Sequence, residues 1–269
     1  MNKSLKIFVC AIFILSAACL SYAGMEGDVY KTSYVCDNLK GGERWRATAE
    51  IRHKEGDIYN ITEKMNGTYT GFEGIISWVA TTDFERTKDE VRPLNMDQRI
   101  FDDSGKLIAV SRQDYNYTDR VVVCTYEDLV KNTTSKKEFV FTKNIINRLL
   151  QGVCGQKFIE AGQTSKEIQV ISPEPALYNI RIAMVGREEI DVNGRKRQAY
   201  KLCFDPMLGM LSFVKVFLPK SYVWHSAEPI FEWLKYEGLE SSVKSPRVEI
   251  ISLDENTTTS IPIPEELAS

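Results

Sequence analysis

The sequence predicts a mainly β protein built on a single curved antiparallel sheet, a half-barrel or meander with one or two short helices packed on it. Three observations carry this prediction. Asn193-Gly194 separates two strand-like runs, and this dipeptide is a strong hairpin signal because both residues accept a positive φ. Turn signals recur at intervals of roughly 8–12 residues, as in all-β sandwiches and barrels. A helical period is clear in only one stretch.

The first half of the chain reads as a series of strands joined by polar turns. Strands are expected at 45–53, 58–65, 68–72, 75–84, 96–101, 106–113, 120–126 and 137–141. The turns between them include Lys54 to Asp57, Asn66-Gly67 and Asp102 to Gly105. The charged stretch 85–95 contains Pro93, which favours a loop or a sheet edge.

The expected helix follows these strands. Its apolar residues Ile145, Ile146, Leu149, Leu150 and Val153 lie on one face, Thr142 or Asn144 can cap its start, and Gly155 can end it. The stripe would pack onto one face of the sheet.

The second half begins with the hairpin arms 179–192 and 195–204. The apolar run 207–218 fits either a short amphipathic helix or a buried strand, because periodicity does not separate the two in short runs. Strands at 221–226, 230–238 and 248–253 complete the sheet.

Residues 1–23 are expected to be a secretory signal peptide, with lysines at the start, an apolar centre and the cleavage site Ser21-Tyr22-Ala23. A less favoured alternative is a lipid anchor on Cys19, where Ser16 replaces the leucine typical of lipoprotein signals. Residues 24–253 then form one β-rich domain, since no linker divides them, and 254–269 form a mobile polar tail. The protein is therefore expected to be exported, most simply to a periplasm.

Charge and cysteine content narrow the function. Removing a leader with two lysines takes the formal net charge from −3 to −5, which argues against a nucleic-acid partner. Four cysteines remain, and in an oxidising compartment they are candidates for two disulfides of undetermined pairing, although small apolar core cysteines are the alternative. These candidates are Cys36, Cys124, Cys154 and Cys203. Their spacing matches no zinc site, and neither a metal nor another cofactor is expected.

No catalytic motif is present. The only histidines, His53 and His225, are far apart, and the chain has no nucleophile elbow or P-loop. Alternation along its strand favours an outward, solvated His225. We therefore expect a protein that is not an enzyme.

Aromatic residues provide the candidate binding site. A sheet curved around an apolar concavity, partly covered by a helix, can hold an acyl chain. The candidate lining residues are Trp78, Tyr222, Trp224, Phe231 and Trp233, and Met207, Met210, Val214 and Phe217 are candidates for peripheral contact with a membrane or a partner. The alternative is a filled core, in which case the protein would be an envelope scaffold or interaction module with a protein partner.

Several short segments carry a family resemblance. At Val185-Gly186-Arg187-Glu188, Val192-Asn193-Gly194, Tyr200-Lys201-Leu202 and Leu218 to Trp224, the chain resembles exported bacterial proteins of domain-of-unknown-function family 3108. The likeness is best from Tyr178 to Leu253. It implies no catalytic residues, because members of that family have no assigned activity. Their overall look is similar to half-barrel lipoprotein carriers of the Lol type, which implies acyl-chain binding between a curved sheet and covering helices.

Overall fold

The computed structural model describes residues 29–207, 220–228, 231–242 and 244–253. The predicted leader and tail lie outside these ranges. No helix among the described residues combines the length and the apolar character needed to span a bilayer.

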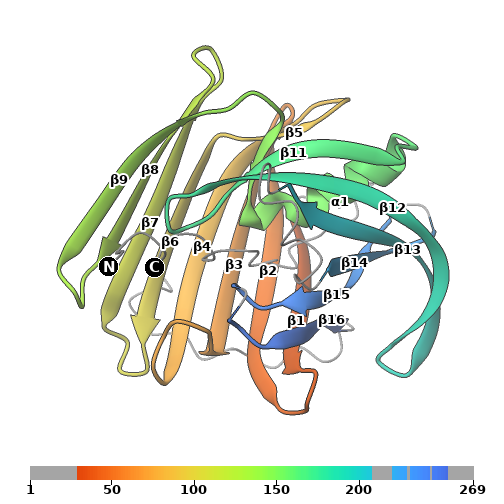
Figure 1. Cartoon of the computed structure of the whole chain (residues 1–269), viewed down its shortest axis with the longest axis horizontal. Coiled ribbons are helices and arrows are strands. Elements are labelled where there is room, and N and C mark those ends of the chain that lie inside the picture. Colours follow the sequence, from red (N-terminus) through yellow and green to blue (C-terminus); the bar gives the residue numbers. More distant parts are fainter. Residues whose placement is uncertain (1–28, 208–219, 229–230, 243, 254–269) are drawn as a thin grey trace, which may run out of the picture.

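Strands form most of the described chain (Figure 1). The first nine are β1 (Val29–Asn38), β2 (Glu43–Glu55), β3 (Ile58–Thr68), β4 (Ile75–Arg86), β5 (Val91–Pro93), β6 (Asn95–Asp102), β7 (Leu107–Asn116), β8 (Val121–Asp128) and β9 (Thr133–Val140). Next come β10 (Ile145–Asn147), the 3-10 turn η1 (Arg148–Leu150) and the helix α1 (Gln151–Glu160). The remaining strands are β11 (Ser165–Ile171), β12 (Leu177–Val192), β13 (Arg195–Pro206), β14 (Ser221–Ser226), β15 (Trp233–Leu239) and β16 (Arg247–Leu253).

All the described strands belong to one sheet, which confirms the predicted fold class. Their order is β10-β11-β12-β13-β14-β15-β16-β1-β2-β3-β4-β6-β7-β8-β9, and β5 pairs with β4 beside this path. Neighbouring strands are antiparallel except β10 and β11, which run parallel. Since β9 and β10 do not pair with each other, the described sheet is open rather than closed.

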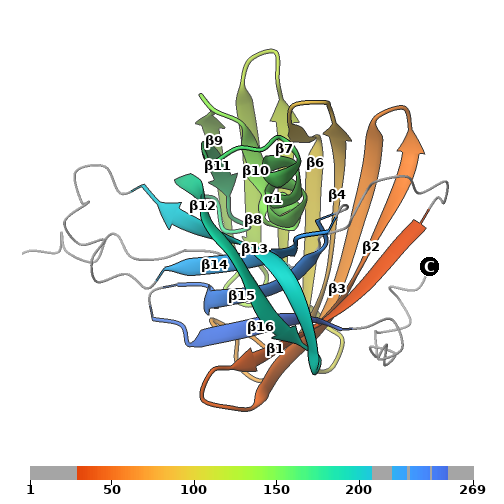
Figure 2. The ribbon, with the colours of Figure 1, turned by 90° about the vertical axis from the view of Figure 1, so that its right-hand side faces the viewer.

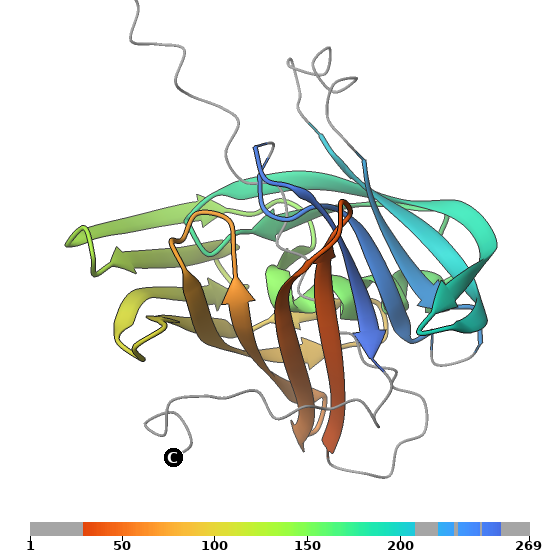
Figure 3. The same ribbon diagram turned by 90° about the horizontal axis from the view of Figure 1, so that it is seen from below.

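The sheet curves strongly around α1, the one α-helix among the described residues. Figure 3 shows α1, in green, inside the curve, between β1 and β2 in brown and the long β12 and β13 in teal. The β12–β13 hairpin crosses β14, β15 and β16 in Figure 2, and its tip is held where Asn193 Nδ2 donates to the Ser252 carbonyl oxygen of β16 at 2.7 Å. Long strands with a right-handed twist coil in this way, so the inward face encloses the helix.

The turn residues explain part of the register. Asn193 and Gly194 have φ values of 52° and 76°, so the predicted two-residue hairpin between β12 and β13 is confirmed. The prediction of a turn at Asn66-Gly67 is wrong, because β3 continues through both residues. A Cβ on Gly67 would lie 2.3 Å from the backbone oxygen of Arg44, so this glycine permits a close approach of β2 and β3.

The helix prediction also needs a correction. Ile145 and Ile146 lie in the strand β10, and the α-helix begins only at Gln151. Asn147, not Thr142 or Asn144, caps the preceding 3-10 turn, and its side-chain oxygen accepts from the Leu149 amide at 3.0 Å. Gly155 lies in the middle of α1 rather than at its end. The apolar run is therefore shared between a buried strand and a buried helix, two structures that periodicity does not distinguish.

Candidate functional site

The helix α1 lies on the inward face of the sheet and is itself almost fully buried. Every residue of α1 except Lys157 and Glu160 is buried. Val153, Cys154, Phe158 and Ile159 join the main core cluster, which also includes residues from most of the strands. A helix that is buried on all sides is unusual for a chain of mixed polarity, and it brings polar side chains into the interior.

An ion pair fixes the start of this helix. Arg148 Nη1 lies 2.7 Å from Glu63 Oε1 on β3, and both side chains are only 2% exposed. Trp78 Nε1 donates to the same carboxylate at 2.9 Å, and the Arg148 guanidinium stacks 4.9 Å from the centroid of the Trp78 ring. The negative charge therefore has both a counter-ion and an additional donor, as a buried carboxylate requires.

A second group of buried polar side chains lacks such partners. Both amide atoms of Gln151, the Nε2 atom of His225 and the Nε1 atom of Trp233 are buried without a hydrogen-bond partner among the described residues. Most buried polar atoms in proteins are paired, because an unpaired one costs about 1–3 kcal/mol. Four such atoms on three side chains mark this region as the candidate binding site.

The three side chains come from α1, β14 and β15. His225 and Trp233 are register partners on adjacent strands, so they share one face of the sheet. A Cβ on Gly155 would lie 2.6 Å from His225 Nε2, which places this ring directly against α1. Gln151 precedes Gly155 by one helical turn and lies on the same side of the helix. We call Gln151, His225 and Trp233 the inner polar site.

The protonation state of His225 follows from its one described partner. Its Nδ1 lies 2.8 Å from the carbonyl oxygen of Phe231, and a carbonyl only accepts, so Nδ1 carries the proton. Burial lowers the pKa of His225 to about 4. The ring is therefore neutral at physiological pH, and Nε2 presents a lone pair to the interior.

The structure separates the aromatic residues that the sequence placed in one concavity. Trp78 and Trp233 lie in the main core cluster, and Phe231 packs against it. Tyr222 and Trp224 belong to a different cluster, with Val192, Ala199 and Leu234.

Alternation along β14 gives the reason for this separation. Val223 lies in the inward cluster and His225 is fully buried against α1, so the residues between and beside them point to the opposite face. On that face Trp224 Nε1 donates to Glu188 at 2.7 Å. The predictions that Trp224 lines the same surface as Trp78 and Trp233, and that His225 faces solvent, are both wrong.

The cysteine candidates form no disulfide within the described residues. Cys36, Cys124 and Cys203 lie on β1, β8 and β13, which several strands separate from one another in the sheet, whereas a disulfide needs Cα atoms less than about 7 Å apart. Cys154 lies on α1, in the core. The disulfide prediction is wrong, and the alternative of buried core cysteines describes the structure. No cluster of three or more potential metal ligands occurs in the described part of the chain.

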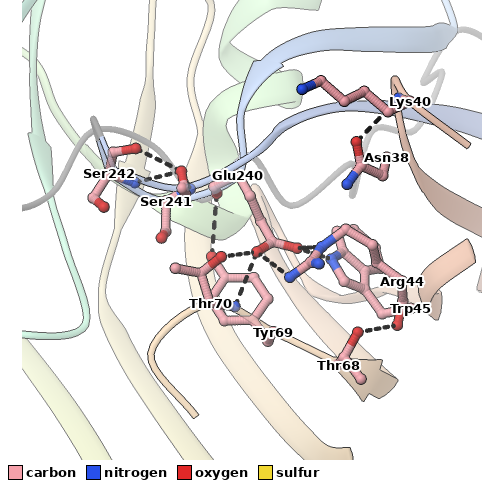
Figure 4. Close-up of polar contacts among 11 residues, drawn as sticks. Asn38, Lys40, Arg44, Trp45, Thr68, Tyr69, Thr70, Glu240, Ser241 and Ser242 are labelled. Atoms are coloured by element: carbon pink, nitrogen blue, oxygen red, sulfur yellow. Dashed lines mark hydrogen bonds and ion pairs between the residues drawn. The ribbon is translucent and has the colours of Figure 1, made fainter. Parts of the chain in front are cut away.

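Figure 4 shows a buried polar cluster that sequence reasoning did not find. Arg44 donates to both carboxylate oxygens of Glu240, from Nε at 2.6 Å and from Nη2 at 2.9 Å. Trp45 Nε1 and the Thr70 amide also donate to this carboxylate, at 3.2 and 2.9 Å, and the Tyr69 hydroxyl donates to the Glu240 carbonyl oxygen. Glu240 therefore ties the end of β15 to β2 and to the loop after β3. Its charge is fully matched, so its role is structural.

Of the candidates for membrane or partner contact, only Met207 is described. It is partly buried, and its amide donates to the Asn179 carbonyl oxygen at 2.8 Å. Met210, Val214 and Phe217 lie outside the described residues, as do Cys19 and the predicted cleavage site.

Comparison with known proteins gives structural neighbours alone. No protein-family model matches the chain, so membership of family 3108 stays a prediction. No curated protein matches it either. The structural neighbours include the hypothetical lipoprotein YmcC from Escherichia coli K12, at 7% identity and a TM-score of 0.29, with 86% of this chain and 90% of that chain covered. Another is a protein from Bacteroides fragilis described as exported, with a YmcC-like fold, at 7% identity and a TM-score of 0.32, with 87% of this chain and 97% of that chain covered.

Proposed function

We propose that this protein is an exported, non-enzymatic binding or carrier protein that holds a lipid-like ligand between the inward face of its curved sheet and α1. The leader-like sequence of residues 1–23 supports export. The apolar inward face supports an acyl chain as the bound group, since each buried methylene contributes about 0.8 kcal/mol.

The observation that carries the proposal is the inner polar site. An interior that evolved only to be filled would gain stability by replacing Gln151 with an apolar residue, because its amide makes no hydrogen bond to the described residues. Buried polar groups that lower stability without a partner in the chain are typical of binding sites. Because α1 occupies the interior, the ligand gains access when α1 shifts relative to β14 and β15.

Native mass spectrometry of the mature protein, purified gently and without detergent, tests this function. We expect a bound mass that is lost on denaturation and that matches an acylated molecule. Trp233→Phe removes a donor on the inward face and should reduce the bound fraction. The matched control Trp224→Phe changes a residue of similar burial on the opposite face and should leave the bound fraction unchanged. Equal effects of the two substitutions would contradict the placement of the ligand.

A second candidate function is an interaction module, favoured by the open edge at β9. This strand pairs only with β8 among the described strands; Val130 in the turn before it and Val140 at its end are 72% and 64% exposed. An open edge can accept a strand from a partner. If the purified protein carries no ligand, and its complexes are lost when Val140 is replaced by lysine, this second function is the better description.

A further inference from the structure

The side chains of the inner polar site restrict the chemistry of the ligand's polar head group. We infer that the polar part of the ligand is an uncharged group that both donates and accepts hydrogen bonds, a hydroxyl or a primary amide, and that Gln151, His225 and Trp233 bind it. This inference rests on the proposed function and adds the chemistry of the head group.

The first step is the inventory of donors and acceptors. Trp233 Nε1 is a donor only. His225 Nε2 is an acceptor only, because Nδ1 already donates to Phe231. Gln151 offers two donor hydrogens and one acceptor oxygen. A group that satisfies all three must therefore accept from Trp233 and donate to His225. A hydroxyl or a primary amide does both, whereas an alkane does neither.

The second step concerns charge. A carboxylate or phosphate has no hydrogen to donate, so it would face the lone pair of His225 Nε2 without a bond. A quaternary ammonium group has no acceptor for the Trp233 N–H. A buried ion also needs an opposite charge close by. The charged residue nearest in sequence to Gln151 is Arg148, three residues earlier, and its charge is already matched by Glu63 at 2.7 Å. No member of the inner polar site carries a charge, and Glu232, next to Trp233 in sequence, is already paired with Arg197 at 3.2 Å, so an ion placed in the site would lack compensation.

The third step is steric. Gly155 stands where α1 faces His225, and any side chain there would meet Nε2, since even a Cβ would lie only 2.6 Å away. Glycine in a helix interior costs about 1 kcal/mol relative to alanine. Glycine therefore lets α1 pack directly against the His225 ring, and a ligand reaches Nε2 when α1 moves away from β14.

The test compares four ligands with the same sixteen-carbon chain. Delipidated mature protein is mixed with hexadecanol, hexadecanamide, palmitate or hexadecane, each delivered as a cyclodextrin complex, and bound ligand is quantified by mass spectrometry after gel filtration. At about 1.4 kcal/mol per factor of ten, one satisfied buried hydrogen bond predicts roughly tenfold tighter binding of hexadecanol and hexadecanamide than of palmitate and hexadecane.

The variant Gln151→Met distinguishes a binding role of Gln151 from a purely structural one, because only a binding role affects the preference among the four ligands. Methionine has a similar volume and no amide, so the ligand-free variant should melt at the same temperature or higher, while its preference for the neutral polar ligands falls by roughly tenfold. Equal binding of all four ligands, tighter binding of palmitate, or an unchanged preference in Gln151→Met would overturn the inference and leave the proposed function standing. If none of the four ligands binds, ordered water is the only occupant of the site, and the proposed function fails with the inference.

Discussion

Replacing Glu63 by glutamine removes one charge from the buried ion pair at the start of α1 and hardly changes the shape of the side chain. Arg148 would remain buried with its guanidinium against Trp78 but without a counter-ion. Breaking a buried pair by removing one partner costs about 3–5 kcal/mol. Glutamine still offers an oxygen to Trp78 Nε1 and to Arg148, so the lower end, about 3 kcal/mol, is expected. For a chain of this size that loss lowers Tm by roughly 6–12 °C.

Glu43→Gln is the matched control for this experiment. Glu43 also pairs with an arginine, Arg46, at 2.6 Å, but the two side chains are 45% and 39% exposed. Exposed pairs contribute about 0–1 kcal/mol, so the control should shift Tm by no more than roughly 4 °C. Thermal and urea unfolding of the two variants measure both values.

A double-mutant cycle completes the argument. Arg148→Met alone leaves the Glu63 carboxylate buried without its counter-ion, whereas Glu63→Gln with Arg148→Met leaves no buried charge at either position. We expect the double variant to be more stable than the sum of the two single effects predicts, by about 1–3 kcal/mol. If Glu63→Gln behaves like Glu43→Gln, or the two single effects simply add, the ion pair does not hold α1 in place and the reasoning is refuted.

Three further predictions concern glycine, histidine and cysteine. Gly67→Ala should destabilise the protein by at least about 2 kcal/mol, since φ is +143° and the new Cβ would overlap the backbone of β2, whereas Gly186→Ala, with no atom within 4 Å, should cost less than about 1 kcal/mol in the same urea titration. The pKa of His225 is about 4 in the folded protein, against 6.5 when unfolded. Between these values the unfolded chain takes up a proton that the folded protein does not, so the free energy of unfolding is highest above pH 6.5 and falls as the pH approaches 4. At 1.36 kcal/mol per pKa unit this loss reaches roughly 3 kcal/mol, so urea midpoints measured from pH 7.5 to 4 should fall more steeply for the natural protein than for His225→Phe, and parallel curves would contradict the assignment. Burial raises the pKa of Cys124 to about 12 and that of Cys154 to about 11, so Ellman's reagent at pH 8 should leave both unlabelled until denaturant is added, and a reductant should not change Tm; rapid labelling of the native protein would show that these thiols are accessible.

Local turn chemistry was readable from the sequence, because it depends on adjacent residues. Asn193 and Gly194 adopt the positive φ values that their hairpin requires, and the predicted strand 221–226 coincides with β14. The role of a glycine was ambiguous where it depends on an element that packs against it from elsewhere in the sequence. The sequence predicts a turn at Gly67 and a helix end at Gly155, yet each glycine lies inside an element and provides room for a neighbour.

The assignment of faces was harder to predict than the strands themselves. Along β14 the bulky Tyr222 and Trp224 alternate with Val223 and His225, and bulk alone favours the aromatic pair as the inward one. The β12–β13 hairpin reverses this expectation, because it crosses β14 to β16 and supplies a second apolar cluster on the other face. Long-range polar contacts gave no local signal either: Arg44 and Glu240 are 196 residues apart.

Three buried polar groups in this fold differ in whether the carboxylate, amide or ring atoms at their centre are satisfied. Glu240 and Glu63 each accept hydrogen bonds from an arginine and a tryptophan, so both carboxylates are paired within the chain and need no ligand. The inner polar site is different, because its atoms are equally buried and find no partner among the described residues. If selection acted on stability alone, the third group would resemble the first two. The contrast within one interior is therefore the reason to look for the ligand at Gln151, His225 and Trp233 rather than at the more conspicuous charged clusters.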